Sequence, residues 1–324
     1  MDDFFTPVSG MELPRYAGVP TFMRLPHVPP GHGRFGDVQI GLIGVPWDGG
    51  TTNRPGPRHG PRALRDASTM IRAQNAITGV RPYELARCAD IGDVGPNPAD
   101  LMETLSRVTA AYEPLVSAGI RPLTAGGDHL TTLPVLRALA KTGPLGLVHF
   151  DSHTDLYRDY FGGTKFTHGT PFRRAVEEGL LDCARCVQIG IRGTAYDMED
   201  RDFAKAHGIR LIPIEECFAR GWIDVMAEAV EIAGTGPVYL SYDIDFVDPA
   251  FAPGTGTPEV GGPNSYDAMA VVRPLSGLDI VGADLVEVSP PFDVGNATAY
   301  LGANIMFEIL CVMAAALDRG AEAA

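Results

Sequence analysis

The sequence is short of positive charge. Its 324 residues include 26 Lys and Arg against 40 Asp and Glu, which leaves a net charge of −14 and a pI of about 4.9. A general nucleic-acid binder needs a basic face to meet phosphate, so we expect no nucleic-acid partner. The acidic balance suits a soluble enzyme and mildly favours a cationic substrate.

Cysteine is also scarce, and long apolar runs are missing. The five cysteines, an odd number, predict a reducing cytoplasm rather than a disulfide scaffold. Cys183 and Cys186 form a lone C-x-x-C, and without a second pair we interpret them as two ordinary residues ahead of a strand, not as a zinc or redox site. Residues 1–5 lack the basic stretch and apolar run of a signal peptide, and no apolar stretch reaches the roughly 18 residues of a membrane-spanning helix. We therefore expect a cytoplasmic protein with no membrane partner.

What the sequence does contain is a repeated order of apolar run, Gly/Asp-rich loop and amphipathic segment. Strands alternating with helices predict βαβ units and a parallel sheet that is buried on both faces. Residues 61–75 are expected to be helical, and residues 1–37, rich in Pro and Gly, are expected to form an extended arm packed on the body or on a neighbouring subunit. No linker, low-complexity tract or internal repeat appears, so we predict a single domain over residues 1–324. The expected strands are residues 38–45, 123–125, 145–150, 187–191, 238–242 and 280–286.

Acidic and histidine side chains follow three of these strands directly. Asp151-Ser152-His153-Thr154-Asp155 offers three ligands at alternate positions and Asp243-Ile244-Asp245 two more, because alternate side chains of an extended segment point the same way. His129 follows two glycines that allow close backbone approach. In open α/β sheets ligands bind outside the carboxyl ends of the strands. Each motif alone is common in solvated turns, but together they predict a metal site made of His129, Asp151, His153, Asp155, Asp243 and Asp245.

The donor set points to a cationic substrate. Four carboxylates balance two divalent cations, and a hydroxide nucleophile would leave a charge of −1, which a guanidinium matches. Glu287, at a further strand end, can pair with a guanidinium in the bidentate fork geometry. A carboxylate-rich set with two His and no thiolate suits Mn²⁺ better than Zn²⁺, with Ni²⁺ or Co²⁺ still possible. Two metals about 3.5–4 Å apart can polarise a shared water near neutral pH.

The other polar candidates are weaker. His168, in the loop of residues 167–170, is a candidate proton shuttle, and the alternative is a loop histidine without a role. Asp128 and Asp248 are interpreted as supporting or turn residues. His149 lies inside an apolar run and is interpreted as a satisfied core residue. The histidines without metal spacing, expected on loops or surfaces, are His27, His32, His59 and His207. No G-x-G-x-x-G follows a strand, which argues against a nucleotide-binding dehydrogenase.

Three of these motifs carry a family resemblance. Residues 126–129, 151–155 and 241–249 resemble the signatures of the arginase/agmatinase ureohydrolase family, and the resemblance covers nearly the whole chain. Residues 20–26, 167–174 and 249–258 resemble the branch that contains guanidinopropionase, guanidinobutyrase and proclavaminate amidinohydrolase.

The resemblance implies a three-layer α/β/α fold with a parallel eight-stranded sheet, two Mn²⁺ ions, and a homotrimer or homohexamer. It implies that His129, Asp151, Asp155 and Asp243 surround one metal. His153 and Asp245 serve the other, with Asp151 and Asp243 bridging. His168 matches the family's active-site histidine and Glu287 the residue that holds the guanidinium, while Asp245 is expected to relay the proton to the leaving amine.

The expected reaction is hydrolysis of a small guanidino compound, best 3-guanidinopropionate or 4-guanidinobutyrate, to urea and an amine. Leu156 and Tyr157 replace the polar residues that many relatives carry after Asp155, so the loop of residues 156–166 is expected to define the substrate tail. The alternatives are guanidine or a small alkylguanidine, agmatine, or a formimino substrate that yields formamide. A non-catalytic subunit of a hetero-oligomer is a further alternative, which the intact set of six ligands argues against.

Overall fold

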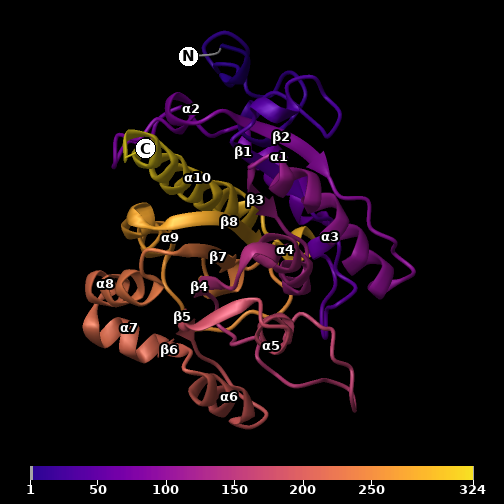
Figure 1. Ribbon diagram of the computed structural model, residues 1–324, viewed down its shortest axis with the longest axis vertical. Coiled ribbons are helices and arrows are strands. Elements are labelled where there is room, and N and C mark those ends of the chain that lie inside the picture. The colour runs from indigo at the N-terminus through magenta and orange to yellow at the C-terminus, as the bar shows by residue number, and fades with distance from the viewer. Residues whose placement is uncertain (1–2, 324) are drawn as a thin grey trace.

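A single parallel sheet organises the molecule. The structure is a computed structural model that describes residues 3–323, with side chains as far as residue 319. Within that range eight strands form the sheet, all paired in parallel, in the order β2-β1-β3-β8-β7-β4-β5-β6 (Figure 1). The strands are β1 (Ile40–Gly44), β2 (Cys88–Asp93), β3 (Arg121–Ala125), β4 (Leu145–Phe150), β5 (Leu181–Ile191), β6 (Arg210–Pro213), β7 (Pro237–Asp243) and β8 (Asp279–Val286).

Helices cover both faces of this sheet. The α-helices are α1 (Gly60–Ser68), α2 (Pro82–Leu85), α3 (Leu101–Ser117), α4 (Thr132–Leu139), α5 (Pro171–Glu177), α6 (Glu199–His207), α7 (Ile214–Arg220), α8 (Trp222–Ala233), α9 (Ser265–Ala270) and α10 (Ala297–Ala323). One apolar core joins the sheet to α1 and α7–α10, and a second joins it to α3–α6. The predicted three-layer α/β/α fold is therefore confirmed.

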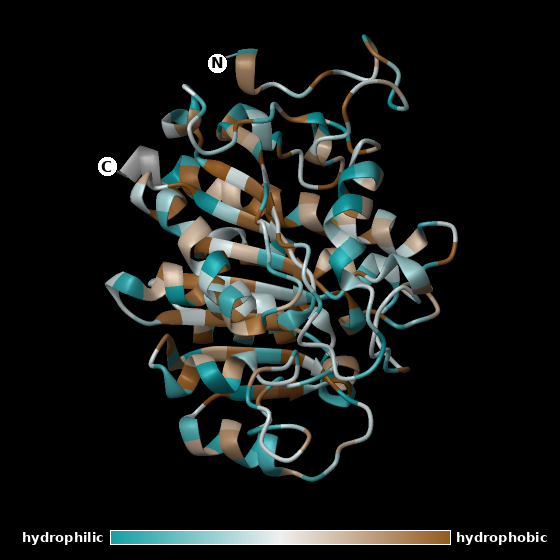
Figure 2. Cartoon of the chain, turned by 90° about the vertical axis from the view of Figure 1, so that its right-hand side faces the viewer, coloured by the Kyte–Doolittle hydropathy of each residue, from teal (hydrophilic) through white to brown (hydrophobic). Residues whose placement is uncertain are grey.

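The strand β4 shows why both faces are covered. Leu145 and Leu147 pack into the core beneath α3–α6, while Val148 and Phe150 pack into the core beneath α8 and α10. Figure 2 accordingly shows mainly brown, hydrophobic residues along the strands. Burying each such side chain contributes roughly 1.5–3 kcal/mol, so a strand without an exposed face stabilises both outer layers.

Several expected elements differ from the structure. The strands β2 and β6 were not predicted, because Gly92 and two Asp interrupt the first and the second has only four residues with Arg and Pro at its ends. The helix expected over residues 61–75 ends at Ser68, and Asn75 instead accepts the N–H groups of Ile77 and Thr78 in a turn. Cys183 and Cys186 lie within β5, not ahead of it, and both are free thiols.

The last helix, α10, is more apolar than expected. Its residues Ala297–Arg319 have the length and hydropathy of a membrane-spanning segment, which the sequence analysis did not anticipate. However, 72% of the apolar stretch of this helix is buried inside the protein, where α10 packs against α1, α2 and β8. A mostly buried core helix passes the same test of length and composition as a membrane-spanning helix. These two properties of α10 are therefore weak evidence for a membrane span.

Residues 3–37 lie along the body and form no regular strand. This segment contains three short 3₁₀ helices, at Asp3–Phe5, Phe22–Arg24 and Phe35–Asp37. The N–H of Phe22 donates to Asp90 at 2.9 Å, and the N–H of Met23 donates to Ser68 at 2.8 Å. Met1 and Asp2 of the expected arm lie outside the described residues, and contact with a neighbouring subunit stays a prediction.

Candidate metal centre

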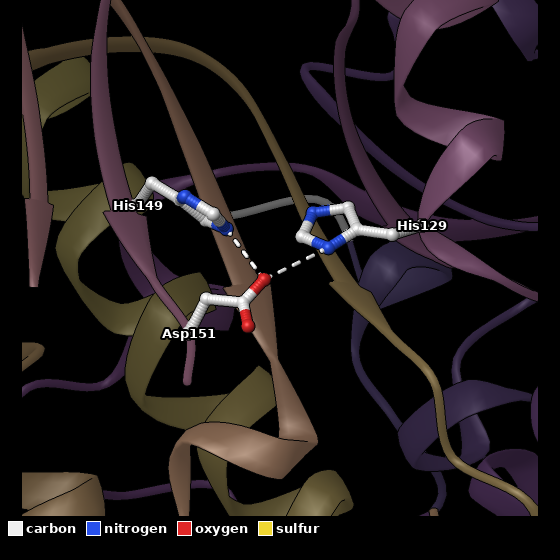
Figure 3. A group of neighbouring side chains, drawn as sticks. All are labelled: His129, His149 and Asp151. Atoms are coloured by element: carbon white, nitrogen blue, oxygen red, sulfur yellow. Dashed lines mark hydrogen bonds and ion pairs between the residues drawn. The ribbon is translucent and has the colours of Figure 1, made fainter. Parts of the chain in front are cut away.

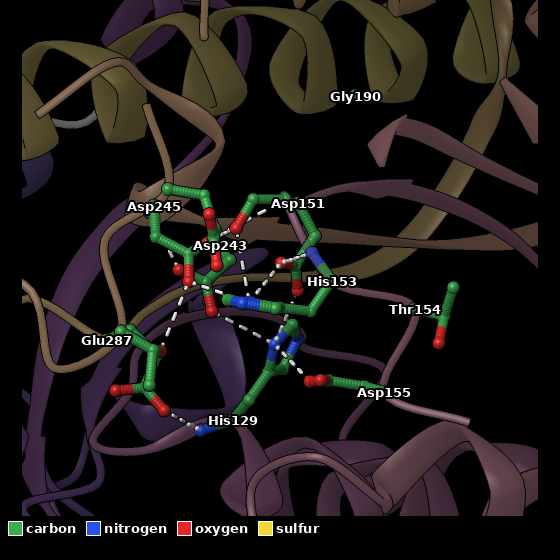
Figure 4. A network of polar contacts seen from close by, with 12 residues as sticks. His129, Asp151, His153, Thr154, Asp155, Gly190, Asp243, Asp245 and Glu287 are labelled. Atoms are coloured by element: carbon green, nitrogen blue, oxygen red, sulfur yellow. Dashed lines mark hydrogen bonds and ion pairs between the residues drawn. The ribbon is translucent and has the colours of Figure 1, made fainter. Parts of the chain in front are cut away.

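The loops that follow β3, β4, β7 and β8 meet at the carboxyl edge of the sheet. The six side chains predicted as ligands come from the last residue of β7 and from the loops after β3, β4 and β7, and they point toward one another in Figure 4. The loop after β8 contributes Glu287. Apart from His153, which is partly exposed, all of these side chains are buried. The structure thus brings together every predicted ligand, although their role as ligands stays a prediction.

His129 is surrounded by carboxylates. Its Nδ1 lies 2.9 Å from an Oδ2 of Asp155, 3.1 Å from Asp151 and 3.2 Å from Asp243. This atom is buried and has no well-formed hydrogen bond within the described part of the chain. Adjacent ligands of an octahedral divalent cation lie about 3 Å apart, so these four donors have the spacing of a coordination shell.

A second group forms beside the first. Nδ1 of His153 lies 3.1 Å from Oδ2 of Asp245 and 3.5 Å from Oδ1 of Asp151. The other carboxylate oxygen of Asp245 accepts the hydroxyl of Ser152 at 2.7 Å. Asp151 therefore touches both histidines, one with each oxygen, which is the arrangement that a bridging carboxylate requires.

The acids strain one another electrostatically. Burial and the charges of Asp245 and Asp151 raise the pKa of Asp243 well above its usual value. Burial and the charge of Asp151 raise the pKa of Asp245 in the same way. Burial lowers the pKa of His129, but the carboxylates of Asp151 and Asp155 outweigh it and raise that pKa well above its usual value. The raised pKa values of Asp243, Asp245 and His129 all indicate an excess of negative charge in this pocket. The residues present therefore fit divalent cations.

Glu287 lies at the rim of this cluster. Its Oε1 accepts the backbone N–H of His129 at 3.0 Å and lies 2.8 Å from Nδ1 of His168. Its Oε2 is buried without a hydrogen-bond partner among the described residues, and Glu287 lines the cavity. One oxygen is thus fixed by the protein, and the other can accept a donor from a ligand.

His168 is held from both sides. The backbone N–H of Thr52 donates to its Nε2 at 3.1 Å, and the Thr52 hydroxyl lies 2.8 Å from the same atom. Because a backbone N–H can only donate, it favours the neutral ring with its proton on Nδ1, facing Glu287. Burial lowers the pKa of His168, but the charge of Glu287 outweighs burial and raises that pKa to about 9. The N–H of Thr52 thus favours the neutral ring, whereas the charge of Glu287 favours the protonated ring.

Two of the site residues have unusual backbone conformations. Asp155 has φ of 53° and Glu287 has φ of 63°, in the left-handed region that non-glycine residues rarely adopt. Such strain costs on the order of 1–3 kcal/mol per residue and is typical of functional sites. The nearby Gly127 is required by space, because a Cβ there would come within 1.6 Å of the carbonyl oxygen of Trp47.

The residues that support the proposed ligands were not predicted from the sequence. Nε2 of His129 lies 2.9 Å from the hydroxyl of Ser241, which donates to the buried Asp284 at 2.7 Å. His149, interpreted as a core residue, is fully buried, but its Nε2 lies 2.8 Å from Oδ2 of Asp151 (Figure 3). The signal was present in the spacing, since Asp151 follows the end of β4 directly, two residues after His149, and alternate side chains of an extended segment point the same way.

The predicted supporting acids have structural partners. Asp128 accepts the N–H groups of Gly50 at 2.6 Å and Leu130 at 3.1 Å. Burial and the charge of Glu287 raise the pKa of Asp128 to about 8. Asp248 accepts the N–H of Gly261 at 2.7 Å and so closes the loop between these two residues.

A cavity of about 480 Å³ leads from this centre outward. The loop of residues 156–166 contributes Tyr157, Tyr160 and Phe161 to its lining, whereas Leu156 is buried in the core and does not line it. The lining residues that sequence reasoning missed are Thr52, Asn53, Gly169, Thr194, Ala195, Tyr196, Thr257, Pro258 and Glu259. None of the described lining residues is Lys or Arg.

Comparison with known proteins identifies the class. The Arginase family model matches residues 38–312, so the chain belongs to this family of metal-dependent hydrolases, as its motifs indicated. It is similar to two proteins of Pseudomonas aeruginosa: guanidinopropionase, 54% identical over 323 residues and 99% of each chain, and guanidinobutyrase, 48% identical over 97% of this chain and 98% of that one. The solved structure of proclavaminate amidino hydrolase from Streptomyces clavuligerus superposes with a TM-score of 0.88 at 41% identity, covering 94% of this chain and 99% of that chain.

Proposed function

We propose that this protein is an amidinohydrolase with two divalent cations, best Mn²⁺, that converts 3-guanidinopropionate or 4-guanidinobutyrate to urea and the corresponding amino acid. The observation that carries the proposal is the convergence of two His and four Asp beside a buried, unsatisfied Glu287 oxygen. The relatives named guanidinopropionase and guanidinobutyrase, which match this chain along almost its whole length, support the substrate class.

The six ligands would divide as their contacts divide. His129, Asp151, Asp155 and Asp243 would hold one cation, and His153 and Asp245 the other, with Asp151 and Asp243 shared. When bound, two such cations supply a water nucleophile that is acidic enough to react near neutral pH, and positive charge to offset the charge that develops in the transition state.

The protein side chains orient the substrate and move protons. Glu287 Oε2 accepts N–H groups of the guanidinium, while Oε1 stays anchored on His129 and His168. Asp245, which accepts the Thr257 hydroxyl at 3.4 Å at the cavity wall, would carry the proton to the leaving amine. His168 exchanges protons with solvent through the hydroxyl of Thr52, which lines the cavity. The sum is guanidinium plus water giving urea plus a protonated amine.

The lining of the cavity favours a second candidate. It has no Lys or Arg among its described residues, and it includes the acidic Glu259 together with three tyrosines. A carboxylate tail would have to rely on hydroxyl and amide donors there, whereas a neutral or cationic tail would not. Agmatine and small alkylguanidines are therefore the alternative substrates, and the loop of residues 156–166 is the segment we expect to separate these tails.

We further propose a cytoplasmic homo-oligomer, a trimer or hexamer, with no nucleic-acid partner. The free thiols and the acidic surface charge support this setting. Sedimentation of the purified chain tests the assembly.

A substrate panel tests the activity. Urea release from the metal-loaded protein is measured with guanidinopropionate, guanidinobutyrate, guanidinoacetate, agmatine, arginine and guanidine, and formamide is assayed with a formimino substrate. The proposal expects the highest kcat/KM with one of the first two. A preference for agmatine or guanidine favours the second candidate, formamide as product contradicts the class of reaction, and no turnover points to a non-catalytic subunit.

A further inference from the structure

We propose that His149 and Gln188 form a relay that fixes the orientation of Asp151, and that His149 is a positioning residue and not a metal ligand. The inference rests on the proposed function, because it assigns Asp151 as the carboxylate shared by both cations. It concerns a histidine that the mechanism above does not use, although its ring nitrogen comes as close to Asp151 as that of His129 does (Figure 3).

The relay runs across two neighbouring strands. His149 on β4 is paired in register with Gln188 on β5, and both side chains are fully buried. The Gln188 amide nitrogen lies 2.9 Å from Nδ1 of His149 and donates to the Thr154 carbonyl at 2.7 Å. On its other side, Nε2 of His149 lies 2.8 Å from Oδ2 of Asp151.

The Thr154 carbonyl sets the direction of the three hydrogen bonds in this relay, from Gln188 to Thr154, from Gln188 to His149 and from His149 to Asp151. A carbonyl can only accept, so the Gln188 atom facing it must be the NH₂ group, and turning the amide over would set two oxygens against each other. The same NH₂ group faces Nδ1 of His149, so Nδ1 must accept and the ring proton must be on Nε2. Nε2–H then donates to Asp151.

This tautomer distinguishes His149 from the proposed metal ligands. His129, His149 and Asp151 are close enough to hold a cation among themselves. A cation on Nε2 of His149 would require the proton to move to Nδ1, where the Gln188 NH₂ group offers no acceptor. His149 therefore keeps its proton and directs it at the carboxylate.

Packing holds the ring where the hydrogen bond needs it. The Phe172 ring lies 4.4 Å from the ring of His149 and 5.2 Å from the ring of His129, centre to centre. Asp151 thus receives a fixed donor on Oδ2 and the N–H of His153, at 2.6 Å, on Oδ1. Both carboxylate oxygens are oriented before any cation arrives, which is how outer partners of ligands raise metal affinity.

The test compares metal binding by purified chains, measured by calorimetric titration of the metal-free protein with Mn²⁺. His149→Phe removes the donor and keeps the ring packing, and His149→Gln keeps an N–H near the position of Nε2. We expect His149→Phe to weaken Mn²⁺ binding about 10–100-fold with the number of sites unchanged, and His149→Gln to recover most of that loss. Gln188→Leu, which releases the tautomer, should give a smaller loss.

Tyr112→Phe is the matched control. It deletes another buried hydrogen bond, to Thr124 at 2.7 Å, that touches none of the ligands, and it should leave Mn²⁺ affinity at the wild-type value. If His149→Phe does not fold, Gln188→Leu and the ¹⁵N spectrum of His149 in the wild type decide the matter, and a proton on Nδ1 in that spectrum overturns the relay.

Two results would overturn the inference while leaving the proposed function standing. One is unchanged Mn²⁺ affinity in both His149→Phe and Gln188→Leu. The other is loss of a whole binding site in His149→Phe, which would make His149 a ligand. A wild-type chain that binds no divalent cation would instead remove the proposed function, and the inference with it.

Discussion

Replacing Glu287 with Gln changes one charge in the cavity without changing the size of the side chain. In the native site Oε1 accepts the His129 N–H at 3.0 Å and faces Nδ1 of His168 at 2.8 Å. The amide oxygen must take this position to keep both donors. The amide NH₂ group then occupies the place of Oε2, where it faces the cavity and presents a donor to a guanidinium that also carries only donors.

The magnitude follows from this geometry. Losing a charge-assisted hydrogen bond costs about 1.5–3 kcal/mol, and leaving two buried donors opposed costs about 1–3 kcal/mol more. We therefore expect Glu287→Gln to lower kcat/KM by roughly 10²–10⁴, at about 1.4 kcal/mol for each factor of ten. Stability should change by less than about 1 kcal/mol, because relief of the repulsion that raises the pKa of Asp128 offsets the weaker bond to His168.

The assay pairs urea release with denaturant unfolding, and Glu308→Gln supplies the control. Glu308 is also buried, but it pairs with Arg273 at 2.7 Å and Asn75 at 2.9 Å, and none of these three residues lines the cavity. Its substitution should cost about 2–3 kcal/mol of stability and leave kcat/KM unchanged. If Glu287→Gln kept wild-type kcat/KM, or lost activity only in proportion to lost folded protein, the role given to Glu287 would be refuted.

Three further predictions address other parts of the molecule. Asp245→Ala should release the second cation and lower urea formation by at least about 10³-fold; metal analysis and activity check this, and a fully active variant contradicts the two-metal site. Glu259→Gln should raise the preference for guanidinopropionate over agmatine by about 2–5-fold, since it removes a screened charge from the cavity wall; an unchanged ratio refutes that reading. At pH 8 a chromogenic disulfide reagent should label Cys183 first, and the labelling rate should rise about tenfold for each pH unit. Burial raises the pKa of Cys88 to about 12, so Cys88 should not react. Rapid labelling of several thiols would contradict this burial.

The central part of the fold was predictable because burial leaves a clear pattern. Strands β4, β7 and β8 have helices on both faces, so their apolar runs mark them in the sequence within a residue or two. Within the described residues the edge strands β2 and β6 each have one neighbouring strand, and an isolated bridge from His27 covers only Asp90 of β2. Polar residues such as Asp90 and Arg210 occur in these two strands. Pattern alone does not distinguish such strands from loops.

The site was predictable to the extent that its residues follow strands. The six proposed ligands are adjacent in sequence to strand ends, and so is Glu287. Thr52 and Glu259 come from loops whose course depends on tertiary packing, and no local spacing connects them to His168 or to the cavity. The relation between His149 and Gln188 is a register between strands, which becomes visible only when β4 and β5 are paired.

The place of β8 in the sheet has a consequence for synthesis of the chain. This strand is the last to leave the ribosome, yet it lies between β3 and β7 and joins the two halves of the sheet. Until residue 286 has emerged, each half exposes an unpaired central edge, and His129 on one half has no fixed distance to Asp243 on the other. Such edges pair readily with other chains. A nascent or truncated protein that ends before β8 should therefore depend on chaperones, and the metal centre can assemble only as one of the final events of folding.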